Sequence, residues 1–419
     1  MPVNRARLAK TMAICLAAAA GLFGCQSDAS LPAAYDYRKA GRAPGIEDQQ
    51  NLGTCWAFAS LGAAESALLP QESWDFSEDH MSLKNSFHMG QNAGGDYLMS
   101  LAYLLSWQGP VTEEADPYND GISPDNLMPV KHVQEVRILP ENDREAIKRA
   151  VYGTGGVQSA LYTSLENSDS ESQYYQKDKA AYYYDGQAEP NHDTVIVGWD
   201  DQYPKENFTI TPPGDGAFLC AGSWGEEFGE DGYFYVSYYD ANIGKTNLVY
   251  SRIDNPDNYD RIYQTDLWGW CGQAGYGEET AYGANVYEAW ENEWLCAAGF
   301  YATGPETEYE IYGVLSPDEG FSDRTLLAKG TLQEMGYYTI DFETPIKIEA
   351  GERFGLVLKI TTKGSIQPVA IEYQADEKKG TVDITDGEGY LSYDGIHFER
   401  TETAMECNIC LKAYTRRIP

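Results

Sequence analysis

Basic residues are scarce in this chain of 419 residues. It carries 30 Lys and Arg against 65 Asp and Glu, which leaves a formal net charge of −35 at pH 7. A surface of this sign repels the phosphates of nucleic acids and the headgroups of anionic lipids. The sequence therefore predicts no nucleic-acid partner, and no basic patch through which the protein would attach to a membrane.

The N-terminal apolar run, residues 12–23, is too short to be a stable membrane span. It follows a basic N-terminus, which is typical of a signal peptide. The run ends in Leu22-Phe23-Gly24-Cys25, which resembles a bacterial lipobox. We expect residues 1–24 to be the signal peptide, Cys25 to be the lipidated first mature residue and 25–30 to be a tether. An aromatic residue is unusual in that motif, so cleavage and secretion remain an alternative to an anchor on the outer face of the cell membrane.

Cysteine is scarce as well, with 8 residues in the whole chain. Apart from Cys15 and Cys25, the cysteines are Cys55, Cys220, Cys271, Cys296, Cys407 and Cys410. These are too few for a disulfide scaffold. The Cys407 and Cys410 pair has the spacing of a zinc half-site, but a zinc site would need two more ligands and only His397 is near in sequence. We expect structural cysteines, no metal and no cofactor.

The stretch from Gln49 to Leu69 is the most informative part of the sequence. A turn signal precedes Cys55, and the residues from Trp56 to Leu69 are apolar and rich in Ala and Leu, which predicts a buried helix. Thr54 is the expected N-cap, so Cys55 would lie in the first helical turn. The helix dipole and the free backbone N–H groups there favour a thiolate. Cys55 is therefore a candidate nucleophile.

Two other residues could assist such a nucleophile. Gln49 precedes Cys55 by six positions, so its side-chain amide could form an oxyanion hole together with the Cys55 backbone N–H. His192 follows Cys55 by 192 − 55 = 137 residues. That separation is typical of one class of enzymes that use a Cys–His pair.

These residues and their neighbours resemble the papain family of cysteine peptidases. The resemblance rests on Gln49, on Cys55-Trp56-Ala57-Phe58 and on the run from Asn191 through His192 to Trp199. Further segments match in the family's order: residues 31–38, Phe76–Asp79, Gly94-Gly95, Ser223-Trp224-Gly225 and Gly229–Tyr233. The resemblance implies a peptidase domain at residues 31–252.

The resemblance also implies a mechanism. A Cys55 thiolate, paired with the His192 imidazolium, attacks a peptide carbonyl and forms an acyl-enzyme. Gln49 and the Cys55 N–H bind the oxyanion, and His192 protonates the leaving amine. The substrates would be peptides or proteins.

Other residues matching the family pattern would support this site. Trp56 follows the nucleophile, and Trp224 would shield the histidine from water. Gly94 and Gly95 would let the backbone of a substrate approach the cleft closely.

The sequence departs from the family at Gly222. An Asn that orients the imidazole should directly precede Ser223-Trp224, but this position is Gly222, which has no side chain. We therefore expect weakened activity. One alternative is an inactive homologue that acts as a surface adhesion or carbohydrate-binding protein. Another is a Cys–His cell-wall amidase, which the residues around Cys55 and Trp224 disfavour.

The remainder of the first domain is predicted more coarsely. Its periodicity and composition predict helices at 95–110 and 141–152, and strands at 155–162, 194–199 and 233–239. Residues 200–216 are rich in Pro and Gly and are expected to form a surface loop. A calcium site at Asp200 and Asp201 is the alternative for that loop.

The composition changes after Tyr250. Residues 255–260 are rich in Pro, Asn and Asp, within a linker expected at 253–262. Beyond them short apolar segments alternate with turn signals, which predicts a β-sandwich without helices at 263–419. The strands are expected at 284–288, 294–303, 309–315, 336–342, 354–360, 369–373 and 409–414.

This second domain resembles the lectin-like domain of some bacterial papain-like peptidases. The resemblance rests on Tyr263-Gln264-Thr265-Asp266 and on the run from Gly389 to Asp394. It implies binding of a cell-surface glycan. The indole rings of Trp268, Trp270, Trp290 and Trp294 could stack on sugars, or they could fill the core. The whole sequence thus predicts an α+β papain-like domain, with a helical half and a β-barrel-like half, followed by an all-β sandwich.

Overall fold

The computed structural model describes residues 30–418. The predicted signal peptide and Cys25 therefore lie outside the described residues. Within residues 30–418, no helix has the length and apolar character needed to cross a membrane.

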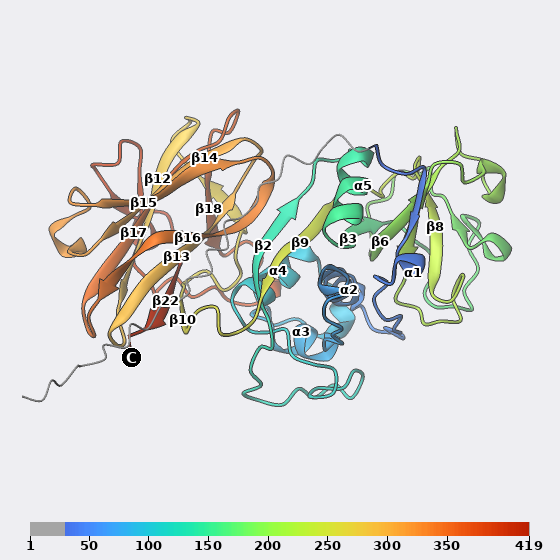
Figure 1. The fold of residues 1–419 in the computed structure, drawn as a ribbon, viewed down its shortest axis with the longest axis horizontal. Coiled ribbons are helices and arrows are strands. Elements are labelled where there is room, and N and C mark those ends of the chain that lie inside the picture. The colour runs from blue at the N-terminus through green and yellow to red at the C-terminus, as the bar shows by residue number, and fades with distance from the viewer. Residues whose placement is uncertain (1–29, 419) are drawn as a thin grey trace, which may run out of the picture. The chain divides into compact units, whose positions relative to one another are not determined.

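The first domain contains five helices and nine strands among the described residues (Figure 1). The helices are α1 (Tyr37–Ala40), α2 (Cys55–Leu68), α3 (Glu78–Lys84), α4 (Tyr97–Leu105) and α5 (Arg144–Gly153). The strands are β1 (Ala34–Asp36), β2 (His132–Ile138), β3 (Val157–Leu161), β4 (Tyr175–Gln176), β5 (Ala181–Tyr182), β6 (His192–Asp200), β7 (Ala217–Ala221), β8 (Tyr233–Ser237) and β9 (Asn247–Asp254).

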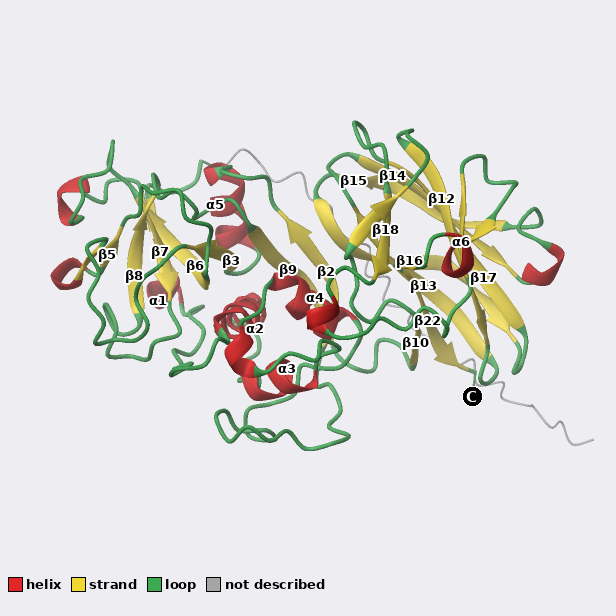
Figure 2. Ribbon diagram, turned by 180° about the vertical axis from the view of Figure 1, so that it is seen from behind, coloured by secondary structure: helices red, strands yellow, loops and turns green. Residues whose placement is uncertain are grey.

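Helix α2 forms the centre of the first domain and confirms the predicted buried helix. Figure 2 shows it against the strands β9, β3 and β6, with α3 and α4 beside it. Small residues let α2 approach the sheet closely: a Cβ on Gly62 would already be in contact with Val195 of β6, at 3.6 Å. Thr54 occupies the N-cap position, but its hydroxyl bonds to Tyr118 at 2.6 Å and does not cap the helix.

The other predicted elements of this domain are confirmed, with bounds that differ by a few residues. Helix α4 lies within 95–110 and begins at a capping residue, Asp96, whose carboxylate accepts a bond from the Leu98 N–H. Helix α5 is capped by Asp143, whose carboxylate accepts a bond from the Ala146 N–H. Strands β3, β6 and β8 lie where β-branched and aromatic residues predict them. The first domain thus has a helical half built on α2, α3 and α4, and a half built of antiparallel strands.

The second domain is built of thirteen strands and one helical turn within the described part of the chain. The strands are β10 (Arg261–Tyr263), β11 (Gly272–Ala274), β12 (Thr280–Glu288), β13 (Glu293–Ala302), β14 (Thr307–Val314), β15 (Thr325–Leu332), β16 (Met335–Ile348), β17 (Arg353–Thr361), β18 (Val369–Tyr373), β19 (Gly389–Ser392), β20 (Glu399–Arg400), β21 (Cys407–Ile409) and β22 (Leu411–Arg417). The turn is α6 (Thr401–Ala404), so the expectation of no helix was wrong at this one point.

The predicted sandwich is confirmed. A six-stranded sheet, β15-β14-β17-β12-β19-β20, faces the strands β10, β22, β13 and β16 across an apolar core. A third sheet contains β11, β18 and β21. The strand predicted at 409–414 is interrupted at Cys410, where the chain leaves β21 in the third sheet and enters β22 in the large one.

The two domains share one sheet, which the sequence did not predict. The order β10-β22-β13-β16-β2-β9-β3-β6-β7-β8 runs from the second domain into the first. The join is the pairing of β16 with β2, from Met335 opposite Ile138 to Tyr338 opposite Glu135. Because backbone hydrogen bonds cross this boundary, the second domain is fixed to the first by more than the chain segment at 255–260.

Candidate active site

Two neighbouring elements supply the candidate catalytic pair. Cys55 is the first residue of α2, and His192 is the first residue of β6. The backbone N–H of Asp193, the residue after His192, acts on the Cys55 thiol and lowers its pKa in part. The fold therefore brings the start of β6 to the start of α2. In the described chain no hydrogen bond joins the thiol to the imidazole.

The His192 ring is held by stacking. It lies flat on the Trp224 indole, with ring centroids 4.2 Å apart and an angle of 8° between the planes. Trp224 is itself fixed by edge contact with Phe228, at 4.6 Å. The expected shielding role of Trp224 agrees with this geometry.

One ring nitrogen of the imidazole lacks a hydrogen-bond partner among the described residues. His192 is buried, and among residues 30–418 its Nε2 atom has no hydrogen-bond partner. An unpaired buried nitrogen of this kind is costly and rare in native proteins. The unpaired nitrogen fits the sequence, because Gly222 has no side chain at the position where an asparagine would orient the imidazole.

There is room for a Cβ at Gly222. A Cβ placed on this residue would meet its nearest neighbours, Gly232 O, a Phe234 ring carbon and a Trp224 ring carbon, all at 3.5 Å. Its backbone does not adopt the left-handed conformation that requires glycine. Glycine at 222 is therefore not imposed by the fold.

Gln49 is oriented by its own hydrogen bonds. Its side-chain oxygen accepts a bond from the Ser223 hydroxyl at 2.5 Å, and its side-chain N–H donates to the Leu52 carbonyl at 2.8 Å. An amide nitrogen carries two N–H groups, so the second one remains for a substrate oxyanion. The backbone is fixed as well, since the Gln49 N–H donates to the Ser223 carbonyl at 2.9 Å.

The resting electrostatics favour neutral forms of both catalytic groups. Burial, with the nearby Asp193 carboxylate second, raises the pKa of the Cys55 thiol to about 12. Burial lowers the pKa of His192 to about 3. These pKa directions run against the thiolate expected at the helix start, because burial opposes the charged form that the helix dipole favours. The structure favours a neutral thiol and a neutral imidazole before substrate binds.

Asp193 is a site residue that sequence reasoning missed. Burial raises its pKa to about 6, although the Gln158 amide donates to its carboxylate at 2.8 Å. The Tyr250 hydroxyl in turn donates to Gln158 at 2.9 Å. A carboxylate here opposes the formation of a thiolate at Cys55. Its position directly after the candidate histidine was the signal that could have identified it.

Glycine suits the two cleft positions, residues 94 and 95, for different structural reasons. Gly94 has a φ of +75°, which favours glycine. A Cβ on Gly95 would lie 2.4 Å from the Trp56 indole nitrogen, so this position must stay without a side chain. Gly95 therefore lies against the helix turn that carries Cys55, and Gly94 lies beside Gly53 just before that turn.

The alternative of a calcium site in the 200–216 loop has no support. Asp201 is engaged by Lys148 and by the Tyr238 hydroxyl. Among residues 30–418, no group of three or more His, Cys, Asp or Glu residues is arranged to hold a metal ion. The six cysteines of this range are all free.

Known proteins resemble both parts of the chain. The family model for the papain family cysteine protease matches residues 31–252, and the model for the lectin like domain matches residues 262–415. Cathepsin K of Gallus gallus is 29% identical over 213 residues, which is 49% of this chain and 59% of that protein. A thiol protease of Hemerocallis sp. is 30% identical over 224 residues, 51% of this chain and 56% of that protein. The chain thus spans less than two thirds of the length of these curated relatives.

Solved structures match both domains together. The clostridial cysteine protease Cwp84 after propeptide cleavage has a TM-score of 0.83 and 26% identity, and the match covers 92% of this chain and 99% of that one. The cysteine protease and lectin-like domains of Cwp84 from Clostridium difficile give 0.82 and 25%, over 93% and 89%. With the family model matching more than half of its residues, the chain belongs to the papain family of cysteine proteases and carries a lectin-like domain.

Proposed function

We propose that this protein is an exported peptidase that hydrolyses peptide bonds with Cys55 as nucleophile and His192 as general base and acid. The observation that carries this proposal is the placement of the His192 ring, flat on Trp224, at the start of the strand that meets the start of α2. Membership of the family supports the same chemistry.

The reaction would begin from the neutral pair. As the Cys55 sulfur bonds to the carbonyl carbon, its proton passes to His192, and the carbonyl oxygen becomes an oxyanion. The free Gln49 N–H and the Cys55 backbone N–H would bind that oxyanion. The C–N bond then breaks, and the amine leaves with the proton from His192. Water, deprotonated by His192, hydrolyses the thioester and restores the thiol.

The site of action follows from the N-terminal pattern and is part of the same proposal. Residues 1–24 would direct export, and a lipid on Cys25 would hold the protein at the outer face of the cell membrane; secretion is the alternative. The relative Cwp84 is described as a surface layer associated protein, which supports an extracellular location. The substrates would then be surface or extracellular peptides and proteins.

Labelling with an epoxide-type inactivator of papain-like peptidases tests the proposal. We expect residues 26–419 to gain one adduct by intact mass, mapped to Cys55. The Cys55→Ala variant should gain none. His192→Ala should react at least about 100-fold more slowly, because no group remains to take the thiol proton.

Two results of the labelling would contradict the proposal. Cys271 and Cys296 are partly exposed free thiols and serve as internal controls. Adducts spread over these two, or an adduct on Cys55 that forms equally fast without His192, would show that Cys55 is not an activated nucleophile.

A second candidate function belongs to the lectin-like domain. Trp294 keeps 39% of its surface exposed, and it lies in an open hollow of about 610 Å³ with Tyr259 and Arg416. The Arg416 Nε–H donates to the Asn258 carbonyl at 2.6 Å, and within the described residues Arg416 forms no ion pair, so its terminal N–H groups remain for hydroxyl or carboxylate groups. An exposed indole beside a hydrogen-bond donor suits the apolar face of a sugar. Trp268, by contrast, is buried.

Titration with soluble oligosaccharides tests glycan binding. The panel would contain oligomers of N-acetylhexosamines and of uronic acids, with binding followed by calorimetry. We propose that Trp294→Ala weakens binding at least about tenfold, because stacking supplies most of the contact area. The control is Trp290→Ala, since Trp290 is 75% exposed but lies under Arg261 at 4.2 Å. Equal affinities in all three proteins would exclude this hollow.

A further inference from the structure

The segment from Ser86 to Asp96, named here the cleft segment, lies directly against the turn that carries Cys55. The Gly53 N–H donates to the Gln91 carbonyl at 3.0 Å. A Cβ on Gly53 would lie 2.9 Å from the Gly94 nitrogen, and Gly95 contacts Trp56 as described above. With this little space, the position of the cleft segment sets the position of the wall that Gly94 and Gly95 form.

The opposite side of the cleft segment is held by the lectin-like domain. The Trp268 indole N–H donates to the Ser86 carbonyl at 3.1 Å, and its ring stacks on Phe87 with centroids 4.5 Å apart. The His88 N–H donates to the Lys379 carbonyl at 2.9 Å. The first three residues of the segment are thus fixed by a domain that the family resemblance treats as an accessory.

The last residue of the segment is held by a charge. Asp96 uses its two carboxylate oxygens for different partners. One accepts a bond from the Leu98 N–H at 2.9 Å and caps α4, and the other receives the Lys379 ammonium at 3.0 Å. The Lys379 side chain is 29% exposed and the Asp96 side chain is 41% exposed, so this ion pair is open to screening by salt.

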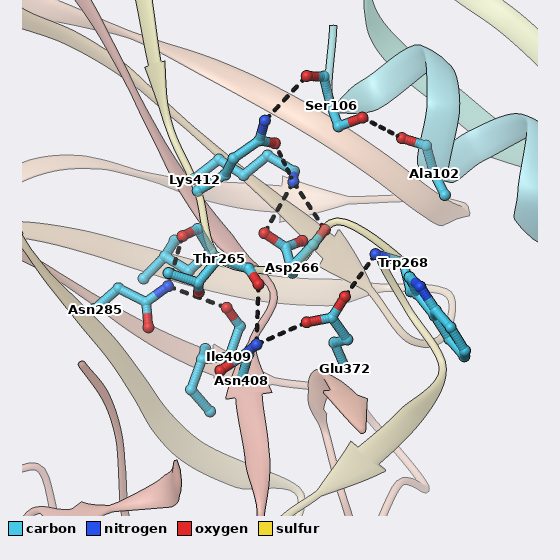
Figure 3. Close-up of polar contacts among 12 residues, drawn as sticks. Ala102, Ser106, Thr265, Asp266, Trp268, Asn285, Glu372, Asn408, Ile409 and Lys412 are labelled. Atoms are coloured by element: carbon cyan, nitrogen blue, oxygen red, sulfur yellow. Dashed lines mark hydrogen bonds and ion pairs between the residues drawn. The ribbon is translucent and has the colours of Figure 1, made fainter. Parts of the chain in front are cut away.

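A buried polar network lies behind the Trp268 contacts of this domain. Figure 3 shows the backbone of Trp268 bound to Glu372 at 2.5 Å, and Glu372 bound to Asn408 at 2.7 Å. A fully buried ion pair, Lys412 to Asp266 at 2.8 Å, lies beside them. The same lysine binds Gln264, whose amide donates to the Ser106 carbonyl at the end of α4. Both ends of the region from the cleft segment through α4 are therefore tied to one polar network.

We propose that the lectin-like domain is a working part of the peptidase, and that Lys379 is the positioning residue through which it holds the Gly94-Gly95 wall of the substrate cleft. This inference rests on the proposed peptidase function. Lys379 contacts neither Cys55 nor His192, and it acts through Asp96. Loss of its charge loosens the wall that binds the substrate backbone and leaves the chemistry at Cys55 intact.

Steady-state kinetics of Lys379→Met test this role. We expect KM for a peptide substrate to rise about three- to fivefold with kcat changed less than twofold, because only substrate binding uses the wall. The matched control is Lys378→Met, since Lys378 is exposed and adjacent but has no ion pair with Asp96. Lys379→Arg should restore most of the lost affinity. Raising NaCl from 0.05 to 0.5 M should raise KM in the natural protein and leave it unchanged in Lys379→Met.

A second variant separates positioning from folding. Asp96→Asn keeps an oxygen for the cap of α4 and loses the charge that Lys379 binds. It should show the same rise in KM, and the double variant should show no further rise. Alkylation of Cys55 by iodoacetamide, which needs no cleft, should proceed at the natural rate in every variant.

The inference is overturned if Lys379→Met leaves KM unchanged, or if kcat and the alkylation rate fall together with the affinity. Failure of the proposed function looks different: the natural protein itself would show neither turnover nor the epoxide adduct.

Discussion

Replacing Gly222 with asparagine is expected to raise kcat/KM by about 10- to 100-fold. The His192 Nε2 atom is buried and has no hydrogen-bond partner in the described chain, and a Cβ fits at residue 222 without a close contact. An amide there would accept a hydrogen bond from Nε2–H, which fixes the tautomer and stabilises the imidazolium as it forms. In the serine triad, the wrong orienting group costs about four orders of magnitude. The gain here should be smaller, because stacking on Trp224 already fixes the ring plane.

The control for this prediction is Gly222→Ala, which fills the same space without an amide. Alanine should give no gain. The pKa of His192 should also rise from its depressed value in the asparagine variant, since a hydrogen bond to the charged form favours that form. If alanine and asparagine raise activity equally, or if asparagine lowers it, the unpaired Nε2 is not what limits the enzyme.

The second large effect concerns stability at alkaline pH. A cavity of about 30 Å³ between α2 and the strands β6 and β7 is lined by four acidic residues, the glutamates Glu47, Glu65 and Glu78 together with Asp193. Burial raises the pKa of Glu47 to about 8 and raises those of Glu65 and Glu78 well above the ordinary value. The other acids that act on this cluster are Asp75 and Glu113. Within the described part of the chain, the Glu78 Oε2 atom has no hydrogen-bond partner.

The sign follows from these raised values. The folded protein holds protons that the unfolded chain loses near pH 4.5, so the stability is present at low pH and is lost as pH rises through about 8. The groups must then be charged in a cavity with room for only one or two waters. We expect Tm to fall by roughly 6–12 °C between pH 5.5 and 8.5, which corresponds to about 3 kcal/mol in a domain of this size. Calorimetric scans across this range measure it.

Charge removal provides the control. A variant with Glu65→Gln and Glu78→Gln should show a much flatter dependence of Tm on pH over that range. Glu114→Gln, which removes an exposed acid in the same region, should keep the natural slope. A flat Tm in the natural protein would mean that these carboxyls are already ionised or hydrated in the fold.

The sequence predicted the catalytic elements because each depends on local signals. The Ala- and Leu-rich run after Cys55 predicted α2, and the periodicity and composition of residues 141–152 predicted α5. The positions of Gln49, His192 and Gly222 came from the family resemblance, and the unpaired Nε2 agrees with the missing asparagine.

What the sequence could not predict depends on long-range packing. The raised pKa of Cys55 arises from burial and from Asp193, and neither is visible in the helix-start pattern that favoured a thiolate. The pairing of Met335–Tyr338 with β2 joins the domains across nearly 200 residues, and the contact of Lys379 with Asp96 spans 283. No local periodicity encodes such partners, because they are set by the tertiary fold.

The most direct test of the central claim is to trap the acyl-enzyme. An activated ester of a short peptide would be mixed with the protein and quenched in acid within milliseconds to seconds, and the mass of the Cys55 peptide would be measured. We predict an acyl group on Cys55 in a burst of up to one per molecule, lost on longer incubation and absent in His192→Ala. An ester that is hydrolysed with no acyl group ever found on Cys55, or with the acyl group on another residue, would contradict the account.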